Sequence, residues 1–138
     1  MLFRSLEVGV PVVERLKAFK KILLEEIEEV DEIIGGLQIS QMRESAGGMS
    51  EHEALVKLAD WLGDIQVYAA SEMAKFGLPL HQVLEIIMSS NMSKLGADGL
   101  PIYNSDGKVQ KGPGYWKPEP AIGALLARLG DKSRLSGH

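Results

Sequence analysis

Apolar residues recur at steps of three and four positions between Pro11 and about Ile34, which is the spacing of one face of an α-helix. The recurring residues are Val12, Leu16, Phe19, Leu23, Ile27, Val30 and Ile34. Pro11 suits the first turn of this helix, and we expect Gly35-Gly36 to end it. A long amphipathic helix needs partners that cover its apolar face, so the pattern favours a helical bundle.

Two more helices are predicted from the middle of the chain. Ser50 followed by Glu53 is typical of a capping box, and the helix that it starts should run from about residue 51 to 76. Gly77-Leu78-Pro79 should end that helix, and a third helix should begin near Pro79. In the third helix the side chains of Val83, Leu84, Ile87 and Met88 are expected to face inward.

Two regions have the composition of loops. Residues 37–49 contain Ser45, Gly47 and Gly48 and predict a loop with at most a short helical piece. Beyond Gly96 the chain is dense in Gly, Pro, Asp and Asn and contains Asp-Gly twice, which indicates an ordered functional loop or a small hairpin. A last short helix is predicted over roughly residues 120–129, followed by a polar tail.

These elements predict a single all-α domain over residues 1–138 that ends in an ordered Gly/Pro-rich loop and a short helix. Two long helices bury too little apolar surface by themselves to form a stable core. We therefore expect a homo-oligomer, either a homodimer that completes the bundle or a dimer of dimers.

Composition excludes several classes of function. The net charge of −4 argues against binding to nucleic acid or to an anionic membrane surface, since both favour a basic protein. The sequence contains no cysteine, so disulfides and thiolate chemistry are excluded. No apolar run approaches the roughly 18 to 20 residues that span a bilayer, and the first residues lack the layout of a signal peptide. We expect a cytoplasmic protein.

One carboxylate lies inside the apolar stripe of the first predicted helix. At roughly 100° per residue, Glu26 falls among Phe19, Ile22, Val30 and Ile33, and Glu29 stands at the edge of the same stripe. Neighbouring acids such as Glu28 and Glu32 fall on the opposite side and have the spacing of ordinary surface residues. A buried ionised carboxylate costs several kcal/mol unless it is paired, protonated or bound to a metal. A divalent-cation site is the interpretation that we favour for Glu26.

A second acidic pair lies on the second predicted helix. Asp60 and Asp64 are four residues apart and so share one side of that helix, where a solvated face is an equally plausible interpretation. Val56 and Val67 lie on the same side, which favours packing there and allows the two helices to direct their acids toward each other. A site with only oxygen ligands suits Mg²⁺, which is usually completed by substrate phosphates. None of the histidines follows a glutamate at the spacing used by di-iron bundles, and we assign them no role.

The acidic motifs resemble those of a known superfamily. The pattern EExxE at Glu25, Glu26 and Glu29, followed by LADWLGDIQVY, resembles the all-α nucleotide pyrophosphohydrolases, which include MazG, dimeric dUTPases and phosphoribosyl-ATP pyrophosphohydrolase. The continuation SNMSKLGADGLPIYNSDGKVQKGPGYWKPEP is most similar to the phosphoribosyl-ATP pyrophosphohydrolase-like branch. The resemblance implies a MazG-like fold and Mg²⁺-dependent attack of water on a nucleoside triphosphate, giving a nucleoside monophosphate and pyrophosphate.

The resemblance also implies roles for the acidic residues. Glu26 and Glu29 match the first acidic pair of the family, and Asp64 matches the aspartate of its second motif. The glutamate position of that second motif holds Trp61 here, and Asp60 can supply the missing oxygen. In the alternative alignment, with Asp60 as the motif's aspartate, the glutamate position holds Lys57, which cannot bind a metal. We predict that Glu26, Glu29, Asp60 and Asp64 bind Mg²⁺, or Mn²⁺ in its place.

Further residues are candidates for catalysis and for substrate binding. Glu25 and Glu26 are the predicted catalytic residues, with Glu25 as the general base. The predicted substrate-binding residues are Tyr68 on the second helix, Asn91 and Lys94 at the end of the third, and Lys108 and Lys111 in the DGKVxKGP element. The segment GKVQKGPG lacks the residue order of a P-loop, so kinase and ATPase functions are disfavoured.

The sequence leaves three functions open. The first is hydrolysis of nucleoside triphosphates, including removal of noncanonical nucleotides. The second is a non-catalytic helical dimer that binds a nucleotide or a protein partner, which Trp61 and Lys57 suggest because glutamate is usual at these positions. The third is phosphoribosyl-ATP hydrolysis, which only the name of the branch implies.

Overall fold

The structure is a computed structural model that describes residues 11–42 and 49–136, with side chains described up to Asp131. The chain divides into two compact units, one within Ser5–Lys75 and the other formed mainly by Phe76–His138. We call the described part of the first unit the helical hairpin and residues 76–136 the C-terminal unit. The positions of the two units relative to one another are not determined. The prediction of a single domain therefore stays a prediction.

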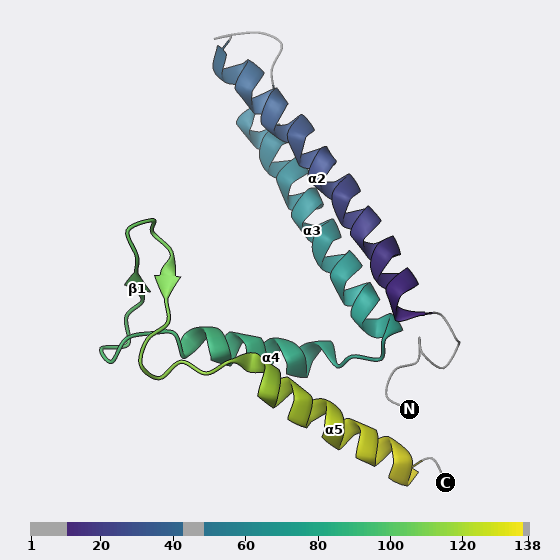
Figure 1. Ribbon diagram of the computed structural model, residues 1–138. Helices are drawn as coiled ribbons and strands as arrows, with labels where there is room; N and C mark the ends of the chain where they lie inside the picture. Colours follow the sequence, from purple (N-terminus) through teal and green to yellow (C-terminus); the bar gives the residue numbers. More distant parts are fainter. Residues whose placement is uncertain (1–10, 43–48, 137–138) are drawn as a thin grey trace. The chain divides into compact units, whose positions relative to one another are not determined.

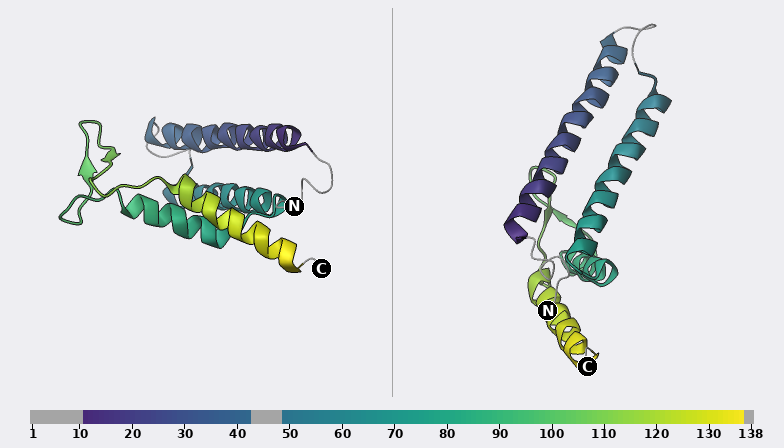
Figure 2. Two further views of the ribbon diagram at one scale, coloured as in Figure 1. Left: turned by 60° about the horizontal axis from the view of Figure 1, so that its bottom comes forward. Right: turned by 90° about the vertical axis from the view of Figure 1, so that its right-hand side faces the viewer.

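Helices α2 (Val12–Met42) and α3 (Glu51–Lys75) form the helical hairpin and run antiparallel beside each other (Figures 1 and 2). An ion pair and a backbone hydrogen bond between the two helices are consistent with this antiparallel order. Arg15 near the start of α2 pairs with Glu72 near the end of α3. At the other end of the hairpin, the Met49 amide donates a hydrogen bond to the Gly36 carbonyl at 3.4 Å.

Helix α2 continues past the point where the sequence predicts its end. Gly35 and Gly36 lie inside the helix, and neither has a positive φ. Gly36 instead allows close packing, because a Cβ atom at this position would lie 2.8 Å from Cε of Met49. The prediction that the two glycines stop the helix is wrong, because both keep a helical backbone and α2 continues to Met42. Residues 43–48 of the predicted loop lie outside the described residues.

Helix α3 has the start and the end that the sequence predicts. The Ser50 amide donates to Oε2 of Glu53 at 3.2 Å, and the Glu53 amide donates to Oγ of Ser50 at 3.1 Å, which confirms the capping box. After Lys75 the chain turns at Gly77, whose φ of 68° is the left-handed conformation that commonly follows a helix.

The C-terminal unit contains helices α4 (Leu80–Met92) and α5 (Pro118–Ser136), joined through a small antiparallel hairpin. Its strands are β1 (Ile102–Tyr103) and β2 (Val109–Gln110), with Ile102 opposite Gln110 and Tyr103 opposite Val109. The predicted hairpin is confirmed, and α5 extends beyond the predicted last helix at both ends. Val83 of α4 is buried as expected, whereas Leu84 and Met88 are exposed, contrary to expectation.

Local hydrogen bonds hold the β1–β2 hairpin to the end of α4. Oδ1 of Asn104 accepts hydrogen bonds from the amides two and four residues further on, which fixes the turn. The Gly112 amide donates to the Lys94 carbonyl at 2.8 Å, and a Cβ at Gly112 would collide with the backbone there. Oγ of the buried Ser90 donates to the Trp116 carbonyl at 2.8 Å. This Gly/Pro-rich segment is ordered by backbone bonds.

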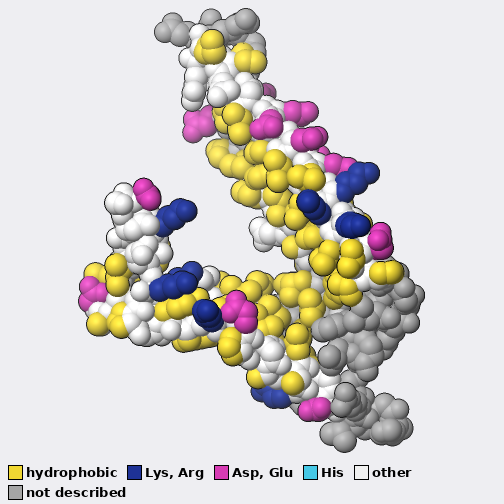
Figure 3. Space-filling view, in the orientation of Figure 1, with side chains coloured by type: hydrophobic (Ala, Val, Ile, Leu, Met, Phe, Trp, Pro, Cys, Tyr) yellow, Lys and Arg dark blue, Asp and Glu magenta, His cyan; other side chains and the backbone are white. Residues whose placement is uncertain are grey.

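The fold is all-α apart from these short strands, as the sequence predicts. Few apolar side chains are buried, and many large ones are exposed along the helical hairpin, where Figure 3 shows a continuous apolar surface. The exposed set on α3 includes Leu55, Leu58 and Leu62, and also Val56 and Val67, which are exposed contrary to expectation. Helix α3 directs its other side, which carries Asp64 and Tyr68, toward α2. No described helix has both the length and the apolar character needed to span a membrane.

Candidate functional site

Glu26 is a buried carboxylate in the middle of α2. Its exposed fraction is 5%, whereas the neighbouring acids Glu25 and Glu28 are exposed, so the helical periodicity separated them correctly. Oε2 of Glu26 is buried and has no hydrogen-bond partner among the described residues. Buried polar atoms are nearly always hydrogen-bonded, so an unpartnered carboxylate oxygen indicates a place for a ligand.

Three groups surround the Glu26 carboxylate: Glu29 one turn along α2, and Asp64 and Tyr68 on α3. Burial raises the pKa of Glu26 above its ordinary value, and the negative charges of Glu29 and then Asp64 raise it further. Hydrogen bonding from Tyr68 opposes this rise in part. The charge of Glu26, together with burial, in turn raises the pKa of the Tyr68 hydroxyl. We call these four residues the acidic cluster.

Trp61 connects α3 to the backbone of Glu26. Its indole Nε1 donates a hydrogen bond to the carbonyl oxygen of Glu26 at 2.7 Å. The sequence places Trp61 at the glutamate position of the second motif without a contact of its own, and in the structure its side chain is half-buried. The position of Trp61 one turn before Asp64 is the signal that could have placed it on the face of α3 directed toward α2.

A cavity of about 290 Å³ lies between α2 and α3 beside the acidic cluster. Its walls are Glu29, Glu32 and Ile33 from α2 and Lys57, Asp60 and Trp61 from α3. Asp60 is exposed and faces this cavity, whereas Asp64 is half-buried within the acidic cluster. Sequence reasoning assigned Glu32 to the solvated surface, so its place in the cavity wall is a correction. The residue is exposed, but its side of α2 borders the gap between the helices.

The acidic cluster has the chemistry of a site for a hard divalent cation. All of its acidic donors are carboxylate oxygens, which Mg²⁺ prefers, and the unpartnered oxygen of Glu26 fits such a ligand. Within residues 11–42 and 49–136, however, no three histidine, aspartate or glutamate side chains are close enough together to hold a metal ion. The predicted set of Glu26, Glu29, Asp60 and Asp64 for Mg²⁺ or Mn²⁺ therefore stays a prediction.

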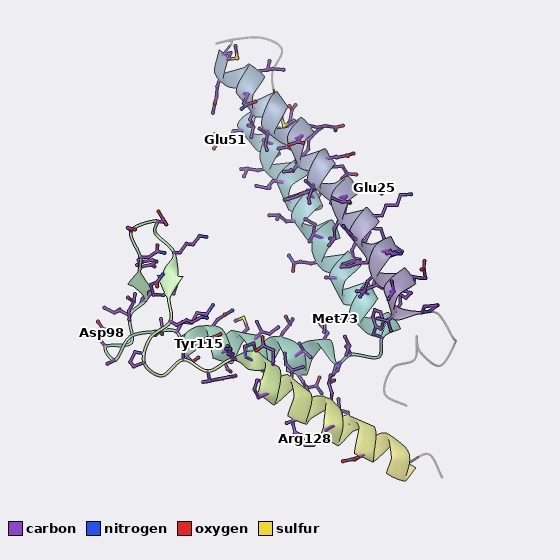
Figure 4. All side chains as sticks on the ribbon, in the orientation of Figure 1. Glu25, Glu51, Met73, Asp98, Tyr115 and Arg128 are labelled. Atoms are coloured by element: carbon purple, nitrogen blue, oxygen red, sulfur yellow. The ribbon has the colours of Figure 1, made fainter. Side chains whose placement is uncertain are left out.

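The remaining predicted site residues fall on different elements. Glu25, which precedes Glu26 in the sequence, is exposed on α2, and Figure 4 labels its side chain. Tyr68, predicted to bind substrate, belongs to the acidic cluster. The other predicted substrate-binding residues lie in the C-terminal unit, and their positions relative to the acidic cluster are not determined.

Those residues lie around the end of α4 and on the β-hairpin. Asn91 is exposed in the last turn of α4, and Lys94 follows the helix with its carbonyl bonded to the Gly112 amide. Lys108 is exposed directly before β2. Lys111 places its Nζ 5.1 Å from the centre of the Tyr115 ring, a cation–π distance. Contact between these residues and phosphate stays a prediction.

Comparison with solved structures finds a protein of similar fold and related sequence. It is the crystal structure of a "putative NTP pyrophosphohydrolase" from Exiguobacterium sp. 255-15, with a TM-score of 0.60, 28% sequence identity, and coverage of 94% of this chain and 72% of that chain. No family model and no curated protein matches the sequence. The similarity confirms the resemblance to the all-α nucleotide pyrophosphohydrolase superfamily. It does not distinguish the MazG-like branch from others.

Proposed function

We propose that this protein is a nucleotide pyrophosphohydrolase that cleaves a nucleoside triphosphate between its α and β phosphorus atoms. The products are a nucleoside monophosphate and pyrophosphate. The observation that supports this most strongly is the buried Glu26 carboxylate, which has an unpartnered oxygen and lies beside the negative charges of Glu29 and Asp64. The structural similarity to a protein named for this activity supports the same class of reaction.

Glu26, Glu29, Asp60 and Asp64 are the residues that would hold Mg²⁺, or Mn²⁺. When bound, the cation would neutralise phosphate oxygens of the substrate and lower the pKa of a water molecule. The acidic cluster favours binding of a cation, because positive charge relieves the repulsion that raises the pKa of Glu26. Carboxylates that repel each other thus gain most when a cation binds between them.

The chain's own residues have further roles in this proposal. Glu25 is exposed beside Glu26 and can accept a proton from the attacking water. Asn91, Lys94, Lys108 and Lys111 supply a hydrogen-bonding amide and positive charges for the nucleotide. Lysine ammonium groups and a divalent cation together balance the charge of a triphosphate, which an acidic cluster alone would repel.

The proposed assembly is a homodimer, with a dimer of dimers as the larger form. The exposed apolar side chains along the helical hairpin support a second copy as the partner, since a two-helix unit leaves this face uncovered. We also propose a cytoplasmic location, where nucleotides are available as substrates.

A nucleotide panel tests the proposed reaction. We expect release of pyrophosphate, measured as phosphate after addition of inorganic pyrophosphatase, from at least one nucleoside triphosphate in the presence of Mg²⁺. The panel includes noncanonical nucleotides and phosphoribosyl-ATP, which separates hydrolysis of nucleoside triphosphates from hydrolysis of phosphoribosyl-ATP. In ¹⁸O-water the label should appear in only one product, the monophosphate or the pyrophosphate, which identifies the phosphorus that water attacks.

The matched pair of variants is Glu26→Gln and Glu28→Gln. Glu26→Gln should abolish turnover, because it removes a proposed cation ligand. Glu28→Gln, an equivalent change at an exposed position two residues along α2, should leave turnover intact. Absence of turnover by the wild-type protein on every nucleotide would contradict the proposed function.

A second function is favoured by two observations. Trp61 and Lys57 stand where the superfamily motif has glutamate, and no three acidic or histidine side chains converge on a metal position in the described residues. Both suit a non-catalytic dimer that binds a nucleotide. Thermal stabilisation by nucleotide with Mg²⁺, in the absence of hydrolysis, would favour this second function.

A further inference from the structure

Trp61 of α3 donates a hydrogen bond to the backbone of Glu26, the buried residue of α2 whose carboxylate has an unpartnered oxygen. The indole Nε1 lies 2.7 Å from the carbonyl oxygen of Glu26, a short distance for a neutral N–H donor. Inside a helix this carbonyl already accepts the amide of Val30, and its second lone pair is free for the indole. The bond therefore acts on the backbone of the residue whose carboxylate lacks a partner.

Apart from the hydrogen bond between Tyr68 and the Glu26 carboxylate, other contacts are poorly placed to fix the two helices at this level. Arg15 and Glu72 form their ion pair 11 residues before Glu26, which is about 16 Å along the axis of α2. The buried apolar side chains of the described hairpin are Ile33 and Ala54, and Ile33 lies about 10 Å further along α2. Between these points the apolar side chains of α2 are half-buried, as at Phe19, Ile22 and Val30, or exposed, and none is fully buried, so packing by itself constrains sliding and rotation only in part.

A small displacement here has large consequences for the acidic cluster. A slip of one residue moves a helix by about 1.5 Å along its axis and turns its side chains by about 100°. Trp61 and Asp64 are one turn apart and share the face of α3 directed toward α2. A bond from Trp61 to the Glu26 backbone therefore sets the height of Asp64 relative to the Glu26 carboxylate.

We propose that Trp61 is a positioning residue, which holds Glu26 and Asp64 at matching heights through its indole N–H instead of contributing a cation ligand. The proposal rests on the proposed function, because the acids that it positions are the proposed cation ligands. It explains why a residue that cannot bind a metal occupies the motif position where the superfamily has glutamate. Here α3 supplies carboxylates at Asp60 and Asp64, and Trp61 fixes where the second of them lies.

The direct test replaces the indole N–H without changing the shape of the side chain. Incorporation of 3-benzothienylalanine at position 61 exchanges N–H for sulfur and keeps the bicyclic ring. We expect kcat to fall about 10-fold with KM for the nucleotide unchanged, and the dissociation constant for Mn²⁺, measured by calorimetry, to rise about 10-fold. A residue that only filled space would change neither quantity after this replacement. Unchanged kcat and unchanged Mn²⁺ affinity would therefore overturn the proposal.

Trp61→Phe and Trp116→Phe provide a matched pair, since these are the two tryptophans of the chain. Trp61→Phe should repeat the effects of the analogue, and Trp116→Phe should leave kcat and Mn²⁺ affinity as in the wild type. Trp116→Phe also assigns the two indole N–H resonances in an NMR spectrum. The Trp61 proton should then exchange slowly with solvent in metal-free protein. Rapid exchange would contradict the hydrogen bond on which the proposal depends.

Failure of the proposed function can be distinguished from failure of this inference. If the wild-type protein hydrolyses no nucleotide, the Mn²⁺ measurement alone decides the role of Trp61. A weaker Mn²⁺ affinity in the analogue would support the positioning role in a binding protein. An unchanged affinity, or a wild-type protein that binds no Mn²⁺, would overturn it. If Trp61→Phe does not fold, the analogue, which keeps the shape of the side chain, provides the result.

Discussion

The helical hairpin buries two glutamates, one with a basic partner and one without. Glu72, near the end of α3, is 8% exposed, and Glu26, in the middle of α2, is 5% exposed. Nη2 of Arg15 donates to both carboxylate oxygens of Glu72 at 2.8 Å, and Nε of Arg15 donates to Oε1 at 3.2 Å. Glu26 has acidic neighbours instead, and its Oε2 has no partner among the described residues.

This difference shows that burial of a charged group does not by itself define a functional site. The guanidinium of Arg15 satisfies the charge and the lone pairs of Glu72, so that pair needs nothing further and holds the two helices together. Glu26 is surrounded by negative charge, so its ionised form is destabilised unless the carboxylate binds a proton or a cation. The position with the unsatisfied carboxylate is therefore the one that we propose binds a cation.

The largest effect should come from removal of the Glu26 charge. Glu26→Gln should lower kcat for the best nucleotide by about 100-fold or more, because a proposed cation ligand is lost where charge is neutralised in the transition state. Steady-state kinetics at saturating Mg²⁺ measures this effect. An activity near that of the wild type would show that Glu26 and Glu72 do not differ in function.

Arg15→Met should affect stability and not activity. The change leaves the Glu72 carboxylate buried without its partner and should lower the free energy of unfolding by about 2 kcal/mol, less than for a fully buried pair because Arg15 is partly exposed. Urea denaturation measures the loss, and kcat per folded molecule should match the wild type. A fall in kcat as large as that of Glu26→Gln would remove the contrast between the two glutamates.

Mg²⁺ should stabilise the protein through Glu26. At a concentration ten times its dissociation constant, one bound ion should add about 1.4 kcal/mol to the free energy of unfolding. This gain should survive in Arg15→Met and disappear in Glu26→Gln. Denaturation curves with Mg²⁺ and with a chelator provide the comparison. Equal gains in both variants would place the cation elsewhere.

The smallest expected effect is a dependence of stability on pH in metal-free protein. The pKa of Glu26 is higher in the folded chain than its ordinary value of 4.5, so the folded state holds this proton more tightly. The stabilisation is present below pH 4.5 and is lost as the pH rises through the raised pKa. Glu26→Gln should therefore become more stable relative to the wild type over this interval. A constant difference between the two proteins across this interval would contradict the shift.

Much of the fold could be predicted because local patterns determine it. The capping box at Ser50 and Glu53, the end of α3 before Gly77 and the hairpin after Gly96 each depend on residues that are neighbours in the sequence. The end of α2 could not be predicted in this way. Gly35 and Gly36 keep a helical backbone here, and the approach of Met49 to Gly36 exists only in the folded helical hairpin.

In the candidate site, too, local features could be predicted and contacts between helices could not. Helical periodicity alone separates Glu26 from Glu25 and Glu28, because side-chain direction in a helix follows from position. The same periodicity could not show that Trp61 bonds to the Glu26 backbone or that Glu32 and Lys57 border one cavity. These contacts join α2 and α3. They depend on the relative height and rotation of the two helices, which the sequence of either helix alone does not determine.

The sequence by itself thus determined that the chain is helical, that Glu26 lies in an apolar stripe and that the acidic motifs resemble those of nucleotide pyrophosphohydrolases. Only the tertiary structure decided which buried glutamate is satisfied and which is not. Glu26 and Glu72 are both carboxylates on amphipathic helices, and nothing local distinguishes them in kind. The distinction arises because antiparallel packing brings a guanidinium to Glu72, whereas Glu26 meets the carboxylate charge of Asp64.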